Sequence, residues 1–263
     1  MFFQKKTPYE KEIASLLKNE RRFLKKRAEK KDSFLNNQIE KVVPPKLQST
    51  LDAAFAKAFE LIFEKGTKVI EKTYNKESLK ADYYENKYNN EVLETKKTLR
   101  AFSKKAKSAG NKNLLLSGAA GIGMGIIGVG LPDIPIFTGL LLKSIYEIAL
   151  DYGFEYESEK ERAFILWVIT GAVSYGDKIT LINRRIDRFI ATGELPDDYN
   201  RTEAVSGAAG ALSKELLYMK FIQGIPIAGA LGGLYDAVYM KRINEYANLK
   251  YRRRQLIERK RKS

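Results

Sequence analysis

The chain of 263 residues contains neither cysteine nor histidine. Without cysteine it has no disulfide and no thiol nucleophile. Without histidine it has no Cys/His zinc site and no Ser-His-Asp or Cys-His mechanism. We expect no cofactor and no metal, because the patterns that would bind them are missing or stand in the wrong context. The start, MFFQKKTPYEKE, has no apolar core and no small-residue cleavage site, which predicts a cytoplasmic chain.

Apolar residues recur at helical spacing along most of the chain, and strand signals are scarce. One apolar stripe at i+3/i+4 spacing predicts a helix over 46–74. Charged helices are expected over 8–38, 78–108 and 234–260, with more apolar helices between them. The sequence therefore predicts an all-α fold, a helical bundle with Gly-rich apolar helical hairpins and basic amphipathic helices at both ends.

Capping residues mark several of the expected helix boundaries. The proline pair at 44–45 ends the first helix, because proline cannot continue a helix. Gly153 and Gly193 follow apolar periodic segments and are expected to end two helices. Ser158, with Glu161 three residues later, has capping-box spacing and predicts the start of the helix AFILWVITGAVSYG.

The net charge of +15 is unevenly spread. Residues 1–113 carry +12, residues 114–235 carry −4 and residues 236–263 carry +7. Two interpretations stay open: solvated helix faces that keep the protein soluble, or attraction to an anionic surface. Few aromatic residues accompany the basic ones, which favours a membrane surface over nucleic acid. The predicted basic surface comprises Arg21, Arg22, Lys25, Lys26, Arg27, Arg252, Arg253 and Arg254.

The segment 114–142 is apolar and rich in glycine, and its only ionisable residue is Asp133. Gly121 and Gly125 have G-x-x-x-G spacing, which favours close helix packing in lipid or in a soluble core. Three interpretations stay open: a buried core, a shallow or re-entrant insertion into lipid, and a spanning helix. Residues 123–128 match G-x-G-x-x-G, but Pro132 follows too soon for the helix that a dinucleotide site needs.

Asp133 is the residue that stands out within this segment, because Pro132 and Pro135 bracket it among apolar neighbours. It is either the N-cap of the next helix or an acidic group in an apolar cleft that binds a cation or a polar headgroup. The run Gly130-Leu-Pro132 has a counterpart in Gly224-Ile-Pro226. The candidate lipid- or partner-binding residues are therefore Gly130, Pro132, Asp133, Pro135, Gly224 and Pro226, with no catalytic or metal-binding residue assigned.

Residues 128–172 resemble the EcsC family in their LPDIP run, in Tyr-Gly-Phe and in the Glu/Arg-started apolar helix. Val43-Pro44-Pro45-Lys46 resembles the start of that family and 224–256 its end, so the resemblance spans about 40–258. The family takes its name from a gene beside a bacterial ABC transporter, and the resemblance implies no catalytic residues. The predicted division is a basic amphipathic N-terminal helix, 1–40, and an EcsC-like helical domain, 41–263.

Together these observations predict a membrane-associated accessory protein on the cytoplasmic face of a bacterial membrane. It would bind anionic lipid and could assist an ABC transporter, which the family resemblance implies. The alternative is a hydrolase or lipid-binding enzyme with a carboxylate site at Asp133, although the sequence favours a role without catalysis. Ligand, partner identity and oligomeric state do not follow from the sequence.

Overall fold

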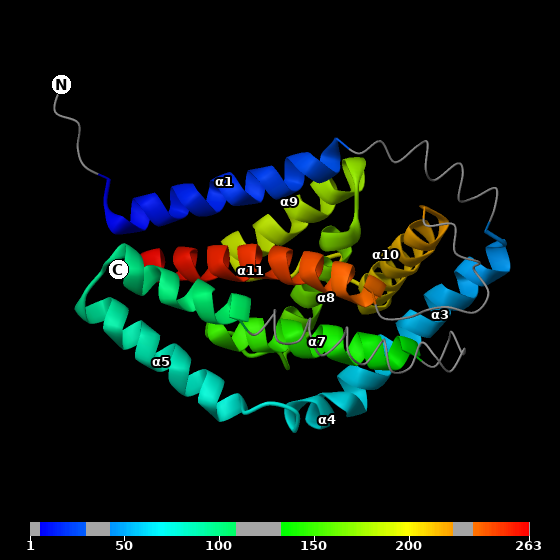
Figure 1. Ribbon diagram of the computed structural model, residues 1–263, viewed down its shortest axis with the longest axis horizontal. Helices are drawn as coiled ribbons and strands as arrows, with labels where there is room; N and C mark the ends of the chain where they lie inside the picture. The colour runs from blue at the N-terminus through cyan, green and yellow to red at the C-terminus, as the bar shows by residue number, and fades with distance from the viewer. Residues whose placement is uncertain (1–5, 30–42, 109–132, 223–233, 263) are drawn as a thin grey trace.

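The computed structural model describes residues 6–29, 43–108, 133–222 and 234–262, and all their regular structure is helical (Figure 1). This confirms the predicted all-α fold. The helices are α1 (Pro8–Ala28), α3 (Pro45–Leu61), the π-helical turn η1 (Ile62–Gly66), α4 (Thr67–Glu71), α5 (Lys76–Val92), a helix over 96–108, α7 (Asp133–Asp151), α8 (Glu159–Val173), α9 (Gly176–Thr192), α10 (Arg201–Ile222) and α11 (Leu234–Lys262).

Helix α8 lies at the centre of the bundle. From Ala163 to Val173 every residue of α8 is buried, because a helix that is apolar on all sides must be covered on all sides. It packs against α9, α10 and α11. Helix α11 crosses the middle of the molecule, with α1 along one side and α7 along the other (Figure 1). The two termini of the described chain therefore meet in one bundle, with α1 packed on α9 and α11.

The amino-terminal half differs from the prediction in two places. The helix expected over 8–38 ends at Ala28. The expected helix over 46–74 exists as α3, η1 and α4 in continuous succession. The single helix expected over 78–108 is wrong, because the backbone becomes extended at Leu93, with φ −142° and ψ 96°. Thr95 then starts a new helix by accepting a hydrogen bond from the backbone N–H of Thr98 at 3.2 Å.

The predicted caps at Gly153, Gly193 and Ser158 are confirmed. The proline pair at 44–45 instead stands at the start of α3, since α1 already ends at Ala28. Gly153 has φ 84°, and the bonds from its N–H to Leu150 O and from Phe154 N–H to Ala149 O end α7 in a Schellman motif. Gly193 ends α9 with φ 74°. Ser158 accepts a hydrogen bond from the backbone N–H of Glu161 at 3.2 Å and starts α8. The carboxylate of Glu161, however, turns away from the cap and into the core.

Part of the Gly-rich segment falls outside the described residues. Gly130, Pro132, Gly224 and Pro226 are among those not described, so the predicted hairpins and their insertion into lipid stay predictions. Asp133 is the first residue of α7, and its side chain lies outside the described part of the structure. Pro135 is exposed in the first turn of α7. Among the described helices, none combines the length and the apolar character that crossing a membrane requires.

Candidate functional site

Helix α1 sorts its charged side chains by sign. Glu12 and Glu20 are eight residues apart, close to two helical turns, and both are buried. Leu16 and Phe23 lie buried on the same side. Six exposed side chains of α1 are cations, and the one exposed acid of the helix is Glu10: the cations are Lys11, Lys18, Arg21, Arg22, Lys25 and Lys26. Apart from Glu10 and the buried Arg27, the helix thus presents acids to the bundle and bases to solvent.

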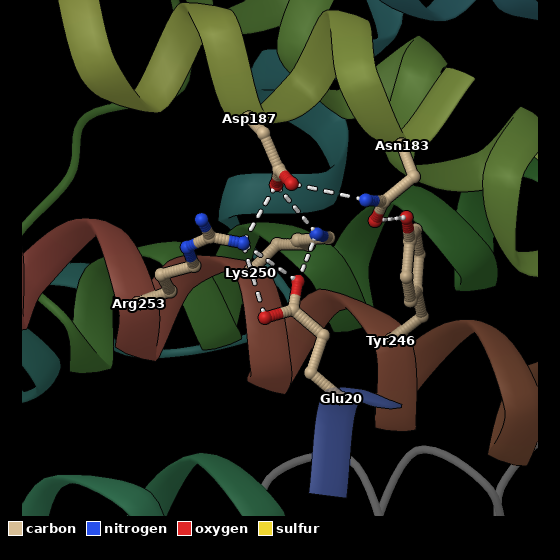
Figure 2. Close-up of polar contacts among 6 residues, drawn as sticks. All are labelled: Glu20, Asn183, Asp187, Tyr246, Lys250 and Arg253. Atoms are coloured by element: carbon tan, nitrogen blue, oxygen red, sulfur yellow. Dashed lines mark hydrogen bonds and ion pairs between the residues drawn. The ribbon is translucent and has the colours of Figure 1, made fainter. Parts of the chain in front are cut away.

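The buried Glu20 belongs to an ionic network centred on Lys250 (Figure 2). The ammonium group of Lys250 is fully buried and donates to Glu20 and, at 2.9 Å, to Asp187. Arg253 bridges the same two carboxylates, at 3.1 Å from Glu20 Oε2 and 2.9 Å from Asp187 Oδ1. Two carboxylates therefore face two cations, and this network ties α1, α9 and α11 together without a net charge.

Two neutral side chains extend the Lys250 network (Figure 2). Asn183 Nδ2 donates to Asp187 at 3.0 Å, and the hydroxyl of Tyr246 donates to Asn183 Oδ1 at 2.8 Å. Burial raises the pKa of Tyr246 well above 10, so its hydroxyl keeps its proton. The ring of Phe23 stacks on Tyr246 at 4.9 Å between centroids. Each carboxylate of the network thus has hydrogen-bond donors, which buried charge requires.

The other arginines at the end of α11 are also paired inside the molecule. Arg252 forms an ion pair with Glu12. Arg254 contacts Glu161 at 2.6 Å and lies 4.0 Å from the ring centre of Phe154. Tyr251 donates to the same Glu161 at 2.6 Å. The chain end that carries +7 in the sequence is therefore largely neutralised by acids from other helices.

This pairing corrects part of the predicted basic surface. Arg27 and Arg252 are buried, with 6% and 9% of their surface exposed, so neither belongs to a basic surface. Arg253 and Arg254 are half-buried and form ion pairs. The prediction counted charge along the sequence, whereas the acids that pair with Arg252, Arg253 and Arg254 come from distant helices.

The remaining basic residues form a surface on neighbouring helices. We define the outer basic face as the exposed cations of α1 together with two exposed arginines of α9, Arg184 and Arg188, which flank the inward Asp187. Two large apolar side chains are exposed on these helices, Leu17 at 39% and Leu181 at 62%. Lys25 pairs with the exposed Glu29 at 3.6 Å, a contact that contributes little in solvent.

Sequence reasoning missed the buried carboxyl group of Asp151. Asp151 is the last residue of α7, only 3% exposed, and its Oδ2 has no hydrogen-bond partner among the described residues. Burial, with smaller effects of Glu147 and Asp82, raises its pKa to about 7. The predicted cap at Gly153 already implied that Asp151 lies at the C-terminal end of its helix, where the helix dipole disfavours a negative charge.

A family model described as the EcsC protein family matches residues 10–256. The chain belongs to the EcsC protein family. This match begins inside α1, whereas the resemblance in the sequence began near residue 40. In this EcsC-family chain the basic first helix is thus part of the matched region and packs on α9 and α11. No curated protein and no solved structure matches the chain.

Proposed function

We propose that this EcsC-family protein is a peripheral membrane protein that binds anionic phospholipid on the cytoplasmic face of a bacterial membrane. The observation that carries the proposal is the charge sorting of α1, whose Glu12 and Glu20 are buried and paired with residues of α11 while six of its cations face outward. Because the inward acids are neutralised by Lys250, Arg252 and Arg253, they do not cancel the outward cations. The outer basic face is the binding surface.

The binding free energy expected from these cations is sufficient for reversible attachment to a membrane. A lysine or arginine near an anionic leaflet contributes about 1 kcal/mol. Six such cations would give about 6 kcal/mol, which corresponds to a dissociation constant on the order of tens of micromolar. Leu17 and Leu181 could add a small apolar contribution by entering the headgroup region. Such binding is peripheral and sensitive to salt. Assistance to an ABC transporter stays a prediction from the family resemblance.

Co-sedimentation with vesicles tests the proposal. We expect the full chain to bind vesicles of phosphatidylcholine mixed with phosphatidylglycerol, and not vesicles of phosphatidylcholine alone. Binding should be lost near 0.5 M salt, where the Debye length falls to about 4 Å. A protein that ignores anionic vesicles at low salt would refute the proposal.

Two variants with the same loss of charge locate the surface. R21Q/R22Q/K25Q removes three cations of the outer basic face, whereas K46Q/K57Q/K68Q removes three exposed lysines of α3 and α4. We expect the α1 variant to bind anionic vesicles at least about tenfold more weakly, since three cations contribute about 3 kcal/mol, and the α3–α4 variant to bind as the wild type does. Equal losses would show that net charge alone governs binding.

A further inference from the structure

Two arginines approach one tyrosine where the end of α1 meets the start of α9. The guanidinium carbon of Arg27 lies 4.8 Å from the ring centre of Tyr175, and that of Arg242 lies 6.0 Å from the same ring centre. The ring centre of Phe23 lies 5.2 Å from the guanidinium carbon of Arg27. Arg27 is buried, whereas Tyr175 and Arg242 are partly exposed. The cluster is therefore accessible from the side of Tyr175 and Arg242.

Glu215 is in direct ion-pair contact with only one of the two arginines. It forms an ion pair with Arg242 and accepts a hydrogen bond from the hydroxyl of Tyr175 at 2.6 Å. Arg242 also donates to the oxygen of Tyr175 at 3.0 Å. Among the residues that the structure describes, no carboxylate lies within ion-pair distance of Arg27. Glu215 and the exposed Glu245 act on the charge of Arg27 only from a greater distance.

Arg27 is therefore a buried cation whose charge is not paired. Burial, together with the neighbouring charge of Arg242, lowers the pKa of Arg27 to about 10. Of its five N–H donors, Nη1 reaches the carbonyl of Ser174 at 3.3 Å. Lys250 differs, because its equally buried charge meets two carboxylates. A buried arginine without an acid is costly, and an anion that binds beside it would offset that cost.

We propose that Arg27 and Arg242 bind a phosphate group. Guanidinium groups bind phosphate through paired N–H donors, and the aromatic rings beside Arg27 hold its planar group in place. The proposal rests on the proposed function, because Arg27 lies on the same helix as Arg21, Arg22 and Lys26 of the outer basic face. The phosphate belongs either to a lipid headgroup or to a free phosphate ester. Such a site would select a headgroup, whereas the outer basic face only attracts negative charge.

The test uses the full chain, the variant R27Q and the control K57Q, which removes the same charge from an exposed position of α3 outside the outer basic face. Inorganic phosphate is titrated by calorimetry against chloride of equal ionic strength. Vesicles that contain phosphatidic acid are compared with vesicles that contain phosphatidylglycerol at matched surface charge. Thermal unfolding without ligand reports whether each variant folds. R27K is the second variant, since it keeps the charge and loses the paired donors.

A free-phosphate site predicts that inorganic phosphate binds to the wild type and to K57Q, and at least about tenfold more weakly to R27Q and R27K. A headgroup site predicts that phosphatidic acid vesicles are preferred by the wild type and K57Q, and that R27Q and R27K lose this preference. The site is overturned if R27Q or R27K responds to both probes as K57Q does. In that event, retained binding to phosphatidylglycerol vesicles would leave the proposed function intact. If the protein binds none of the vesicles, the proposed function is wrong. The titration with inorganic phosphate then still decides whether Arg27 and Arg242 bind phosphate.

Discussion

Replacing Lys250 by methionine removes the central cation of the ionic network and keeps a side chain of similar length. In the wild type, the buried ammonium group contacts both Glu20 and Asp187. In K250M, these two carboxylates share one cation of the network, Arg253. Removing one partner of a buried pair costs about 3–5 kcal/mol, because the charge that remains is buried without its partner. We expect about 3 kcal/mol, since Arg253 still contacts both acids.

Urea unfolding followed by circular dichroism measures this loss. The control is K25M, because Lys25 is exposed and its pair with Glu29 should contribute less than about 0.5 kcal/mol. The double variant E20Q/K250M should recover part of the loss, because it also removes the carboxylate that lost its partner. If K250M unfolds within about 0.5 kcal/mol of the wild type, the network does not hold α1 on the bundle, and the structural role assigned to these charges is wrong.

Two further predictions concern α7. D151N should flatten the dependence of stability on pH. The folded-state pKa of Asp151 is raised from 3.8 to about 7, so the folded protein keeps a proton that the unfolded chain has lost. The free energy of unfolding of the wild type should therefore fall by up to about 4 kcal/mol as the pH rises from about 4 to about 7, and D151N should be the more stable protein near pH 8. Equal pH profiles of stability for wild type and variant would contradict this prediction. The second prediction is that G153A destabilises while G139A stabilises in the same urea assay. Gly153 has φ 84° with the ring of Tyr83 against it, so G153A should cost more than about 1 kcal/mol. An added methyl at Gly139 meets nothing within 4 Å, so G139A should gain about 0.5–1 kcal/mol. Equal effects of the two substitutions would refute the role of Gly153 as the cap of α7.

Helix boundaries were predictable where a local signal sets them. Ser158, Gly153 and Gly193 act on backbone groups within a few residues, so their roles follow from the sequence alone. The break at Leu93 was missed, because no proline or glycine marks it. Its only local signal is the pair Thr95 and Thr98, whose hydroxyl and N–H groups cap the next helix.

The roles of the basic residues were only partly predictable. The exposed positions of Arg21, Arg22, Lys25 and Lys26 follow from the helical period of α1. The pairing of Lys250 with Glu20 joins residues that are 230 positions apart. No periodicity within α11 reveals such a partner, because it depends on the packing of α1 against α11. Long-range pairing therefore decides which cations are structural and which are left to face solvent.

The most direct measurement of membrane binding through the outer basic face uses the absence of cysteine. Single cysteines at position 17 of α1, 181 of α9 and 69 of α4 each take one environment-sensitive fluorophore, and all three wild-type side chains are exposed. The proposal predicts that anionic vesicles raise and blue-shift the emission of the labels at 17 and 181, and that the label at 69 does not respond. A response at 69 with none at 17 or 181 would place the contact on α4 and contradict the proposal.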